Sequence, residues 1–309
     1  MSFLDSASFR LWDEAPVATL TQAPDVKWLG LVWHLSPSSL GMFRRCPRQW
    51  YLRYVKGIKE APGESLVIGS MFHETVEYSH RFKIESHEDK PLSECIEYLN
   101  DAAVPKVLDE AGGASEVKWD VGGDVALAVD RARSDAERIT TAYHHSVLPR
   151  IQPTAVEQRF EWRPEGFPLP IIGYLDVISD DARIIDTKTG KQVSKKIKPS
   201  WQLQGLTYAN ATTLPVEFHS ISRAKTPSIA TPLESGDDMI VYPQQQQSEN
   251  LVRLIRTMMD QIEWYMHRFG PDQEWPALGR LADWSQNLLP CKMCAWQKDC
   301  PAWVGEEIR

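Results

Sequence analysis

Two kinds of apolar pattern divide the chain into predicted elements. Apolar and polar residues alternate in four segments, which predicts β-strands. These segments are residues 154–163, 170–179, 182–188 and 215–223. Apolar residues recur at helical spacing in other segments, which predicts helices. These are residues 35–60, 66–84, 91–110 and 122–148, the segment that follows Pro199, and residues 248–269. Helices frame three consecutive strands, and another helix precedes the fourth, so the order predicts an α/β sandwich built on a central sheet.

The second and third predicted strands carry polar residues that their apolar surroundings do not explain. The stretch Gly173 to Lys188 reads as two strands joined by a tight Ser-Asp-Asp turn. Asp176 lies in the first strand, and Asp186 and Lys188 lie two residues apart in the second, so they share a face. Two carboxylates and an ammonium group are costly to gather at strand ends unless a ligand uses them. A divalent metal would neutralise the carboxylates, and a phosphate would engage the lysine.

Composition limits the classes of protein to consider. The chain has 309 residues, of which 42% are hydrophobic and 25% charged, as in an ordinary globular protein. The net charge of −8 argues against binding of nucleic acid over the whole surface. No apolar run reaches the roughly 18–20 residues of a membrane span. Residues 1–16 lack a basic segment followed by an apolar core, so we expect no secretory signal and a reducing, cytoplasmic location.

Basic residues are nevertheless concentrated in two stretches. The segment from Arg44 to Lys59 combines cations with aromatic rings, and Pro47 is expected to interrupt its helix just after Cys46. Such a mixture suits phosphate contacts together with base stacking. The alternative is an amphipathic helix with a solvated basic face. The predicted DNA contacts are Arg44, Arg45, Arg48, Trp50 and Tyr51, with Lys191, Lys195, Lys196 and Lys198 from the second stretch.

Hydrolysis of a phosphodiester near neutral pH would give these polar residues a common purpose. A divalent cation helps to make the nucleophile and to stabilise the negative charge that develops. Asp176 and Asp186 are the oxygen ligands that Mg²⁺ prefers, and the backbone carbonyl of Thr187 is a third candidate. Lys188 would hold the attacking water or offset charge on the phosphate. Further on, Gln204 and Tyr208 share one helix face, where they would bond a phosphate or a base edge.

Taken together, these motifs resemble those of the PD-(D/E)XK nuclease superfamily, in its RecB-like branch. The motifs are His73, Gly173-Tyr174-Leu175-Asp176, Asp186-Thr187-Lys188 and Gln204-x-x-x-Tyr208. The resemblance implies a restriction-endonuclease-like core, in which helices flank a central mixed sheet. It also implies that His73 is an additional metal ligand, and that Gln204 and Tyr208 form the QxxxY motif of the branch. Leu175 stands where the name of the superfamily has proline, although GxxD is the usual form in this branch.

The cysteines extend the resemblance. In a reducing compartment, three cysteines within ten residues indicate a metal or cluster site rather than disulfides. The spacing is similar to that of the iron–sulfur cysteines in CRISPR-associated exonucleases and in the AddB nuclease domain. That likeness implies a structural 4Fe-4S cluster, with one ligand ahead of the nuclease core and three after it. A zinc site with four cysteine ligands has the same ligand count and stays open as an alternative. The predicted ligands are Cys46, Cys291, Cys294 and Cys300, whereas Cys95 is expected to be an inert buried thiol.

The resemblance also implies a domain organisation and an activity. Residues 1–34 would be an extension and residues 35–303 a single nuclease domain. Within it, 85–150 would be a helical insert, and 288–303 with Cys46 would form the cluster region. The expected activity is Mg²⁺- or Mn²⁺-dependent exonuclease cleavage of DNA from single-stranded ends, with 5′ to 3′ polarity favoured, next to a helicase or recombination partner. The alternative is a non-catalytic DNA-binding or adaptor subunit of a helicase–nuclease or spacer-acquisition complex.

Overall fold

The computed structural model describes residues 32–120, 122–164 and 167–276, together with residues 294, 296 and 300. Most of the predicted extension 1–34, the predicted ligand Cys291 and most of the 288–303 segment therefore lie outside the described residues. Within the described part of the chain, no helix is long and apolar enough to cross a membrane.

The strands form one mixed sheet, which confirms the predicted α/β class. The described strands follow the order β1-β2-β3-β4-β5, and β6 also pairs with β4. β1 to β3 are antiparallel, whereas β3 and β4 are parallel and joined by a helical crossover. The bounds are β1 (Pro153–Trp162), β2 (Ile171–Ser179), β3 (Ile184–Gly190), β4 (Val216–Ser222), β5 (Ile229–Ala230) and β6 (Ile240–Val241). β5 and β6 have two residues each, too few to show the alternation by which the longer strands were predicted.

Two of the described helices begin at side-chain caps. Ser36 and Ser39 form a reciprocal capping box at the start of α1, and the Asp124 side chain accepts a hydrogen bond from the Ala126 amide at the start of α6. Pro47 ends α1 after Cys46 and starts α2, as predicted. The α-helices are α1 (Pro37–Arg45), α2 (Pro47–Trp50), α3 (Glu64–Ser86), α4 (Leu92–Tyr98), α5 (Val104–Glu110), α6 (Val125–Ser146), α7 (Pro199–Thr212), α8 (Pro232–Ser235) and α9 (Gln245–Phe269).

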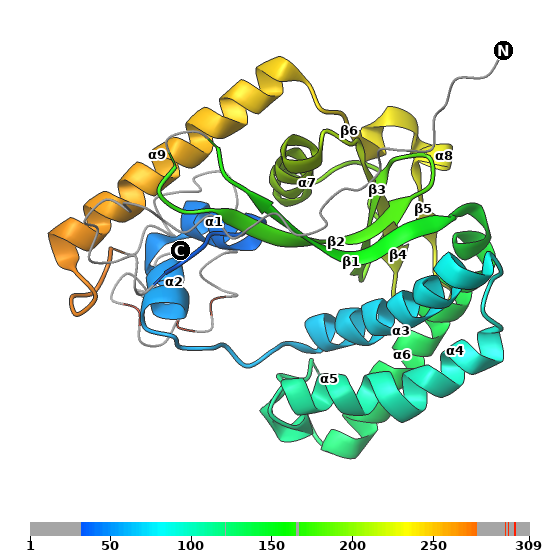
Figure 1. Ribbon diagram of the computed structural model, residues 1–309. Helices are drawn as coiled ribbons and strands as arrows, with labels where there is room; N and C mark the ends of the chain where they lie inside the picture. The colour runs from blue at the N-terminus through cyan, green and yellow to red at the C-terminus, as the bar shows by residue number, and fades with distance from the viewer. Residues whose placement is uncertain are drawn as a thin grey trace, which may run out of the picture.

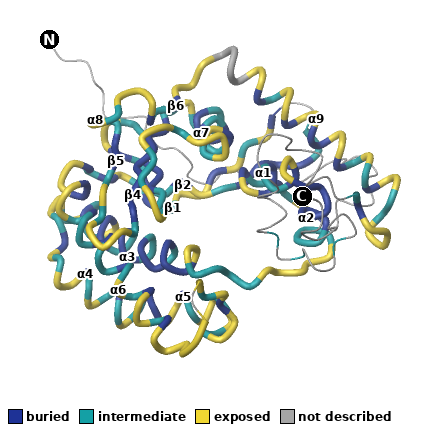
Figure 2. Tube along the Cα trace, turned by 180° about the vertical axis from the view of Figure 1, so that it is seen from behind, coloured by how far each residue is buried: buried dark blue, intermediate teal, exposed yellow. Residues whose placement is uncertain are grey.

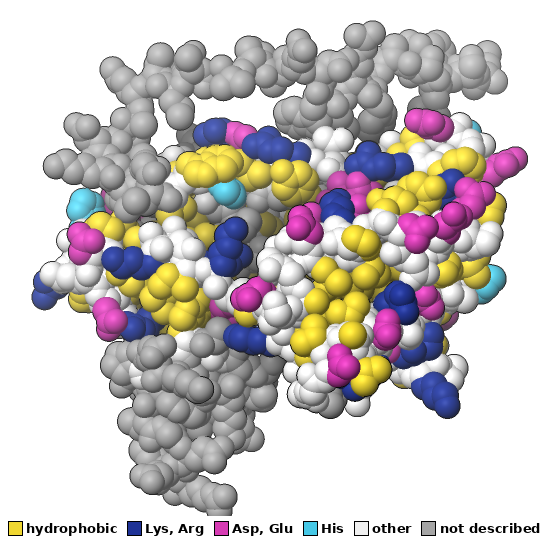
Figure 3. Space-filling view, turned by 90° about the horizontal axis from the view of Figure 1, so that it is seen from below, with side chains coloured by type: hydrophobic (Ala, Val, Ile, Leu, Met, Phe, Trp, Pro, Cys, Tyr) yellow, Lys and Arg dark blue, Asp and Glu magenta, His cyan; other side chains and the backbone are white. Residues whose placement is uncertain are grey.

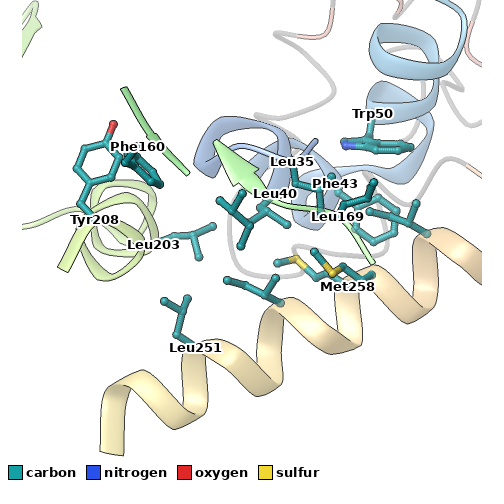
Figure 4. Packing of buried hydrophobic residues seen from close by; sticks show 14 of the residues in the cluster. Leu35, Leu40, Phe43, Trp50, Phe160, Leu169, Leu203, Tyr208, Leu251 and Met258 are labelled. Carbon is teal, nitrogen blue, oxygen red and sulfur yellow. The ribbon is translucent and has the colours of Figure 1, made fainter. Parts of the chain in front are cut away.

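Helices cover both faces of the sheet and enclose two apolar cores. α3 and α6 lie on one side, whereas α1, α7 and α9 lie on the other (Figure 1). The core strands are buried, while the outward surfaces of α4 and α5 are exposed (Figure 2). Figure 4 shows the larger core, where Leu251 and Met258 of α9 face side chains from α1 and α7. Those side chains are Leu40, Phe43 and Leu203.

The aromatic residues after α1 belong to this core. Trp50 and Tyr51 are 0% and 1% exposed, and both rings stack on Trp275, which follows α9. The Tyr51 hydroxyl donates to the Pro271 carbonyl at 2.9 Å. Arg48 is also buried, and it pairs with Glu274 at 2.8 Å. The prediction that these three side chains contact DNA is therefore wrong, because residues more than 200 positions away cover them.

Candidate active site

The predicted carboxylates face one another where β2 and β3 separate. The ladder pairs Val177 with Ile185 and Ile178 with Ile184 and then ends. The next pair in that register is Asp176 and Asp186. Instead of a backbone pair, the Thr187 amide donates to the Oδ2 atom of Asp176 at 3.3 Å. The end of the ladder thus gathers these polar groups at one point between the two strands.

Asp186 and Lys188 form a buried ion pair on β3. The Asp186 side chain is fully buried, and the Lys188 Nζ atom lies 2.7 Å from its Oδ1 atom and donates to Oδ2 at 3.0 Å. Burial raises the pKa of Asp186 above its usual range, and the charge of Lys188 opposes that rise only in part. Burial tends to lower the pKa of Lys188, but the attraction of Asp186 and Asp176 outweighs it and the pKa rises. Lys188 is therefore a protonated cation beside a carboxylate that is hard to ionise.

His73 reaches the same centre from α3. Its Nδ1 atom lies 3.6 Å from the Oδ2 atom of Asp176. One turn earlier, Gly69 allows α3 to pack close to β3, since a Cβ atom there would lie 3.1 Å from the Thr189 hydroxyl oxygen. The predicted ligands His73, Asp176 and Asp186 thus come from one helix and two strands.

Gln204 and Tyr208 approach the centre from α7. The Gln204 amide donates to the Tyr208 hydroxyl at 2.7 Å, as their spacing predicts. Burial, followed by the charge of Asp186, raises the pKa of Tyr208, so the phenol stays protonated. The ring of Tyr208 meets the Phe160 ring edge-on with 5.4 Å between centroids. Phe160 in turn lies over Gly173, where a Cβ atom would come within 2.6 Å of the ring, so the glycine of the GxxD motif makes room for this stack.

The donor atoms suit a hard divalent cation. Among the residues that the structure describes, no three His, Cys, Asp or Glu side chains converge to enclose an ion on their own. Mg²⁺ does not require such a cage, because it keeps several waters and binds one or two carboxylates together with substrate phosphates. The buried Oδ1 atom of Asp186 accepts no aligned hydrogen bond, despite the nearby ammonium group. Asp176 and Asp186 offer hard oxygen donors at the open end of the two strands, so the residues present fit a divalent ion.

Glu157 is a further acidic residue at this centre that the sequence analysis missed. In the β1–β2 ladder, Val156 pairs with Val177 and Gln158 with Leu175, and Glu157 and Asp176 occupy the intervening positions, which are not paired. Burial and then the charge of Asp176 raise the pKa of Glu157 to about 7. The β1–β2 hairpin register, counted back from the loop, would have revealed this neighbour.

Three of the four predicted cluster cysteines are described. Cys46 is buried between α1 and α2, and Cys294 and Cys300 are partly exposed free thiols. Burial raises the pKa of the Cys294 thiol, and the hydrogen bond to Glu274 raises the pKa of Arg48. The described residues nevertheless contain no group of three ligands arranged for a metal ion.

The remaining predicted DNA contacts lie at the surface. Arg44, Arg45 and the lysines of the 191–198 segment are exposed. Lys191 pairs with Asp120 at 2.8 Å and Lys196 with Asp238 at 3.6 Å, so acidic neighbours offset part of their charge. Basic side chains on the face in Figure 3 are interspersed with acidic and apolar ones rather than gathered in one block.

Fold and site together define an α/β enzyme of the nuclease kind, with paired aspartates and a lysine at the separating ends of two strands. The chain belongs to the PD-(D/E)XK nuclease superfamily, whose family model matches residues 34–301. No curated protein matches the chain.

Two solved structures match the chain at low sequence identity. One is from Eubacterium rectale and is provisionally named an exonuclease. It is 11% identical, with 78% of this chain and 85% of that chain covered and a TM-score of 0.46. The other is SSO0001, which is 13% identical, with 74% of this chain and 97% of that chain covered and a TM-score of 0.33.

Proposed function

We propose that this protein is a metal-dependent DNA exonuclease that acts on single-stranded ends. The observation that carries the proposal is the meeting of Asp176 and Asp186 at the open end of β2 and β3, with Lys188 on the second carboxylate. Nucleases of this superfamily usually use a divalent metal such as Mg²⁺, and the family implies DNA as the substrate. A bound Mg²⁺ or Mn²⁺ would supply Lewis acidity and positive charge for phosphodiester hydrolysis.

Each residue of the site has a distinct task in this proposal. Asp176, Asp186 and His73 hold the cation, with help from the Thr187 carbonyl. Lys188 holds the attacking water, because its ammonium group stays charged and donates hydrogen bonds. Gln204 and Tyr208 align the DNA strand through their hydrogen-bonded side chains. Their contacts would be joined by phosphate contacts from the exposed residues Arg44, Arg45, Lys191, Lys195 and Lys196.

A structural 4Fe-4S cluster is the second part of the proposal. This part rests on the spacing of the cysteines along the sequence, with Cys46, Cys291, Cys294 and Cys300 as the four ligands. A zinc ion held by the same four thiolates is the competing assignment. Anaerobically purified protein should contain about four irons and absorb visible light. A colourless protein that contains zinc and no iron would establish the competing assignment. Cytoplasmic location and a helicase or recombination partner stay predictions.

The activity is tested with end-labelled single strands in Mn²⁺, with the 5′ or the 3′ end blocked. Asp186→Asn and Lys188→Ala should each lower the cleavage rate by at least about a hundredfold, because each removes a group from the reacting centre. Asp180→Asn and Lys225→Ala, at exposed positions, are the matched controls and should keep full activity.

Three results would contradict parts of this assignment. Wild-type protein that binds DNA without metal-dependent cleavage would favour the non-catalytic DNA-binding or adaptor subunit. Full activity in both site variants would refute the assigned centre. Cleavage that persists with both ends blocked would refute the exonuclease mode.

A further inference from the structure

Tyr174 is a large aromatic residue that β2 leaves in solvent. It is 53% exposed, whereas its strand neighbours Ile171 and Leu175 are 0% and 1% exposed. In the described part of the chain, its ring stacks on no other ring and its hydroxyl has no hydrogen-bond partner. A β-branched residue such as threonine would suit an exposed strand position equally well. Stability of the fold therefore does not require a ring at this position.

A cation lies beside this ring on the neighbouring strand. Arg159 of β1 pairs with Tyr174 in the ladder, and directly opposite residues project from the same face with Cβ atoms about 4.5–5.5 Å apart. Arg159 is exposed, and it shares the carboxylate of Glu161 with Arg163, through contacts of 2.9 Å and 2.6 Å. One carboxylate thus serves two guanidinium groups, so a surplus positive charge remains next to the exposed ring.

The ring also lies close to the candidate active site. Tyr174 precedes Asp176 by two residues on β2, which is about 7 Å along an extended strand. The side chains of Asp176 and His73 are 23% and 35% exposed, whereas that of Asp186 is fully buried. DNA that enters the centre would approach these partly exposed groups, and this brings the neighbouring nucleotide within reach of the Tyr174 ring.

We propose that the Tyr174 ring stacks on a base of single-stranded DNA bound at this centre, while Arg159 contacts an adjoining phosphate. The assignment rests on the proposed nuclease function, because the strand that it holds is the substrate of the same site. Aromatic rings beside cations hold single strands without reading their sequence, since every base has a π-face. Bases inside a duplex are stacked on one another, so the ring favours unpaired ends.

Binding of a fluorescein-labelled oligothymidylate in EDTA, which prevents metal-dependent cleavage, tests the proposal directly. Tyr174→Thr removes the ring and keeps a residue that suits a strand. It should raise the Kd by at least about fivefold, the lower end of what one stacked base contributes. Tyr174→Phe keeps the ring and should bind like the wild type. The control is Tyr242→Ala, at an exposed tyrosine that follows β6 and bonds Asp237 at 3.1 Å, and it should also bind like the wild type.

A strand of abasic sugars separates stacking from a structural effect. This strand keeps the phosphates and lacks the bases, so the wild type and Tyr174→Thr should bind it with equal affinity. Arg159→Gln should weaken binding of both strands, because it removes a phosphate contact. It should also lower the slope of log Kd against log salt concentration by about 0.7.

The outcomes distinguish this assignment from the nuclease function. Wild-type affinity of Tyr174→Thr for the base-bearing strand, or an equal loss of affinity on both strands, would overturn the stacking role even if the wild type cleaves DNA. Wild-type protein that binds through Tyr174 and cleaves nothing in Mn²⁺ would refute the nuclease function and leave the stacking role in place. Wild-type protein that binds no single strand in EDTA would overturn the stacking role, and cleavage in Mn²⁺ would then decide the nuclease function by itself.

Discussion

The contact between Gly173 and Phe160 gives a quantitative prediction for the GxxD motif. In Gly173→Ala, the new methyl group would lie 2.6 Å and 2.9 Å from two carbons of the Phe160 ring. Ordinary carbon contacts are about 3.5–4.0 Å, so the ring must move by about 1 Å. Overpacking of this kind costs about 1–3 kcal/mol, and the reduced freedom of the unfolded chain returns about 0.4–1 kcal/mol. We expect a net loss of about 1–2 kcal/mol in the free energy of unfolding.

Displacement of the Phe160 ring should also disturb α7, which carries Gln204 and Tyr208. Phe160 meets the Tyr208 ring edge-on, so displacement of Phe160 disturbs the hydroxyl that Gln204 holds. We therefore expect Gly173→Ala to lower DNA cleavage more than it lowers Mn²⁺ binding. Urea unfolding and cleavage assays measure the two effects. Gly41→Ala is the control, because a methyl group at that helical position meets no atom within 4 Å and should leave stability unchanged or slightly raised.

A double-mutant cycle can refute this reasoning. Phe160→Ala removes the ring and should cost about 3–5 kcal/mol by leaving a cavity. In the double variant, the methyl group introduced by Gly173→Ala occupies part of that space. The combined loss should therefore be smaller than the sum of the single losses by at least about 1 kcal/mol. Losses that add within about 0.5 kcal/mol would show that the Phe160 ring is not what requires glycine.

Two further predictions concern buried basic side chains. Burial, then the charges of Lys83 and His219, lowers the pKa of His80 to about 3 from 6.5. The unfolded chain thus binds the extra proton, so stability is complete above about pH 6.5 and falls toward about pH 3 by up to about 1.4 kcal/mol per pH unit. His80→Gln should flatten Tm against pH there, and an unchanged slope would contradict the assignment. Among the described residues, the Nε and Nη1 atoms of the buried Arg48 have no hydrogen-bond partner. If the proposed iron–sulfur cluster is present, Arg48→Met should lower bound iron at least about twofold while shifting the Tm of iron-free protein by less than about 3 °C. Unchanged iron content would contradict the idea that the Arg48 cation offsets negative charge on the proposed cluster and its thiolates.

The elements with long apolar patterns could be predicted from sequence, and so could the residues on them. β2 and β3 begin and end within two residues of their predicted bounds, and α7 starts at Pro199 as expected. The meeting of Asp176 and Asp186 follows from the tight turn between their strands, which makes it a local property. Gln204 and Tyr208 are likewise neighbours on one helix.

What could not be predicted depends on distant contacts or on backbone angles. Trp50 reads as a surface aromatic until Trp275 is known to cover it, and no local pattern joins those two residues. Glu157 reads as an ordinary strand residue, because its left-handed φ angle leaves no mark on the alternation of its neighbours. β5 and β6 owe their existence to hydrogen bonds with β4 rather than to their own sequence.

The contacts between residues 48–51 and residues 271–275 have a consequence for folding during synthesis. A ribosome completes every described strand of the sheet before it reaches Trp275. Until then the indole of Trp50 and the phenol of Tyr51 lack their cover, and the segment that will provide it lies more than 200 residues downstream. Closure of so long a loop is slow and exposes apolar surface meanwhile. Nascent chains that stall after β6 would therefore carry the proposed active-site residues while Trp50 and Tyr51 are still uncovered, and we expect chaperones to bind these chains most firmly.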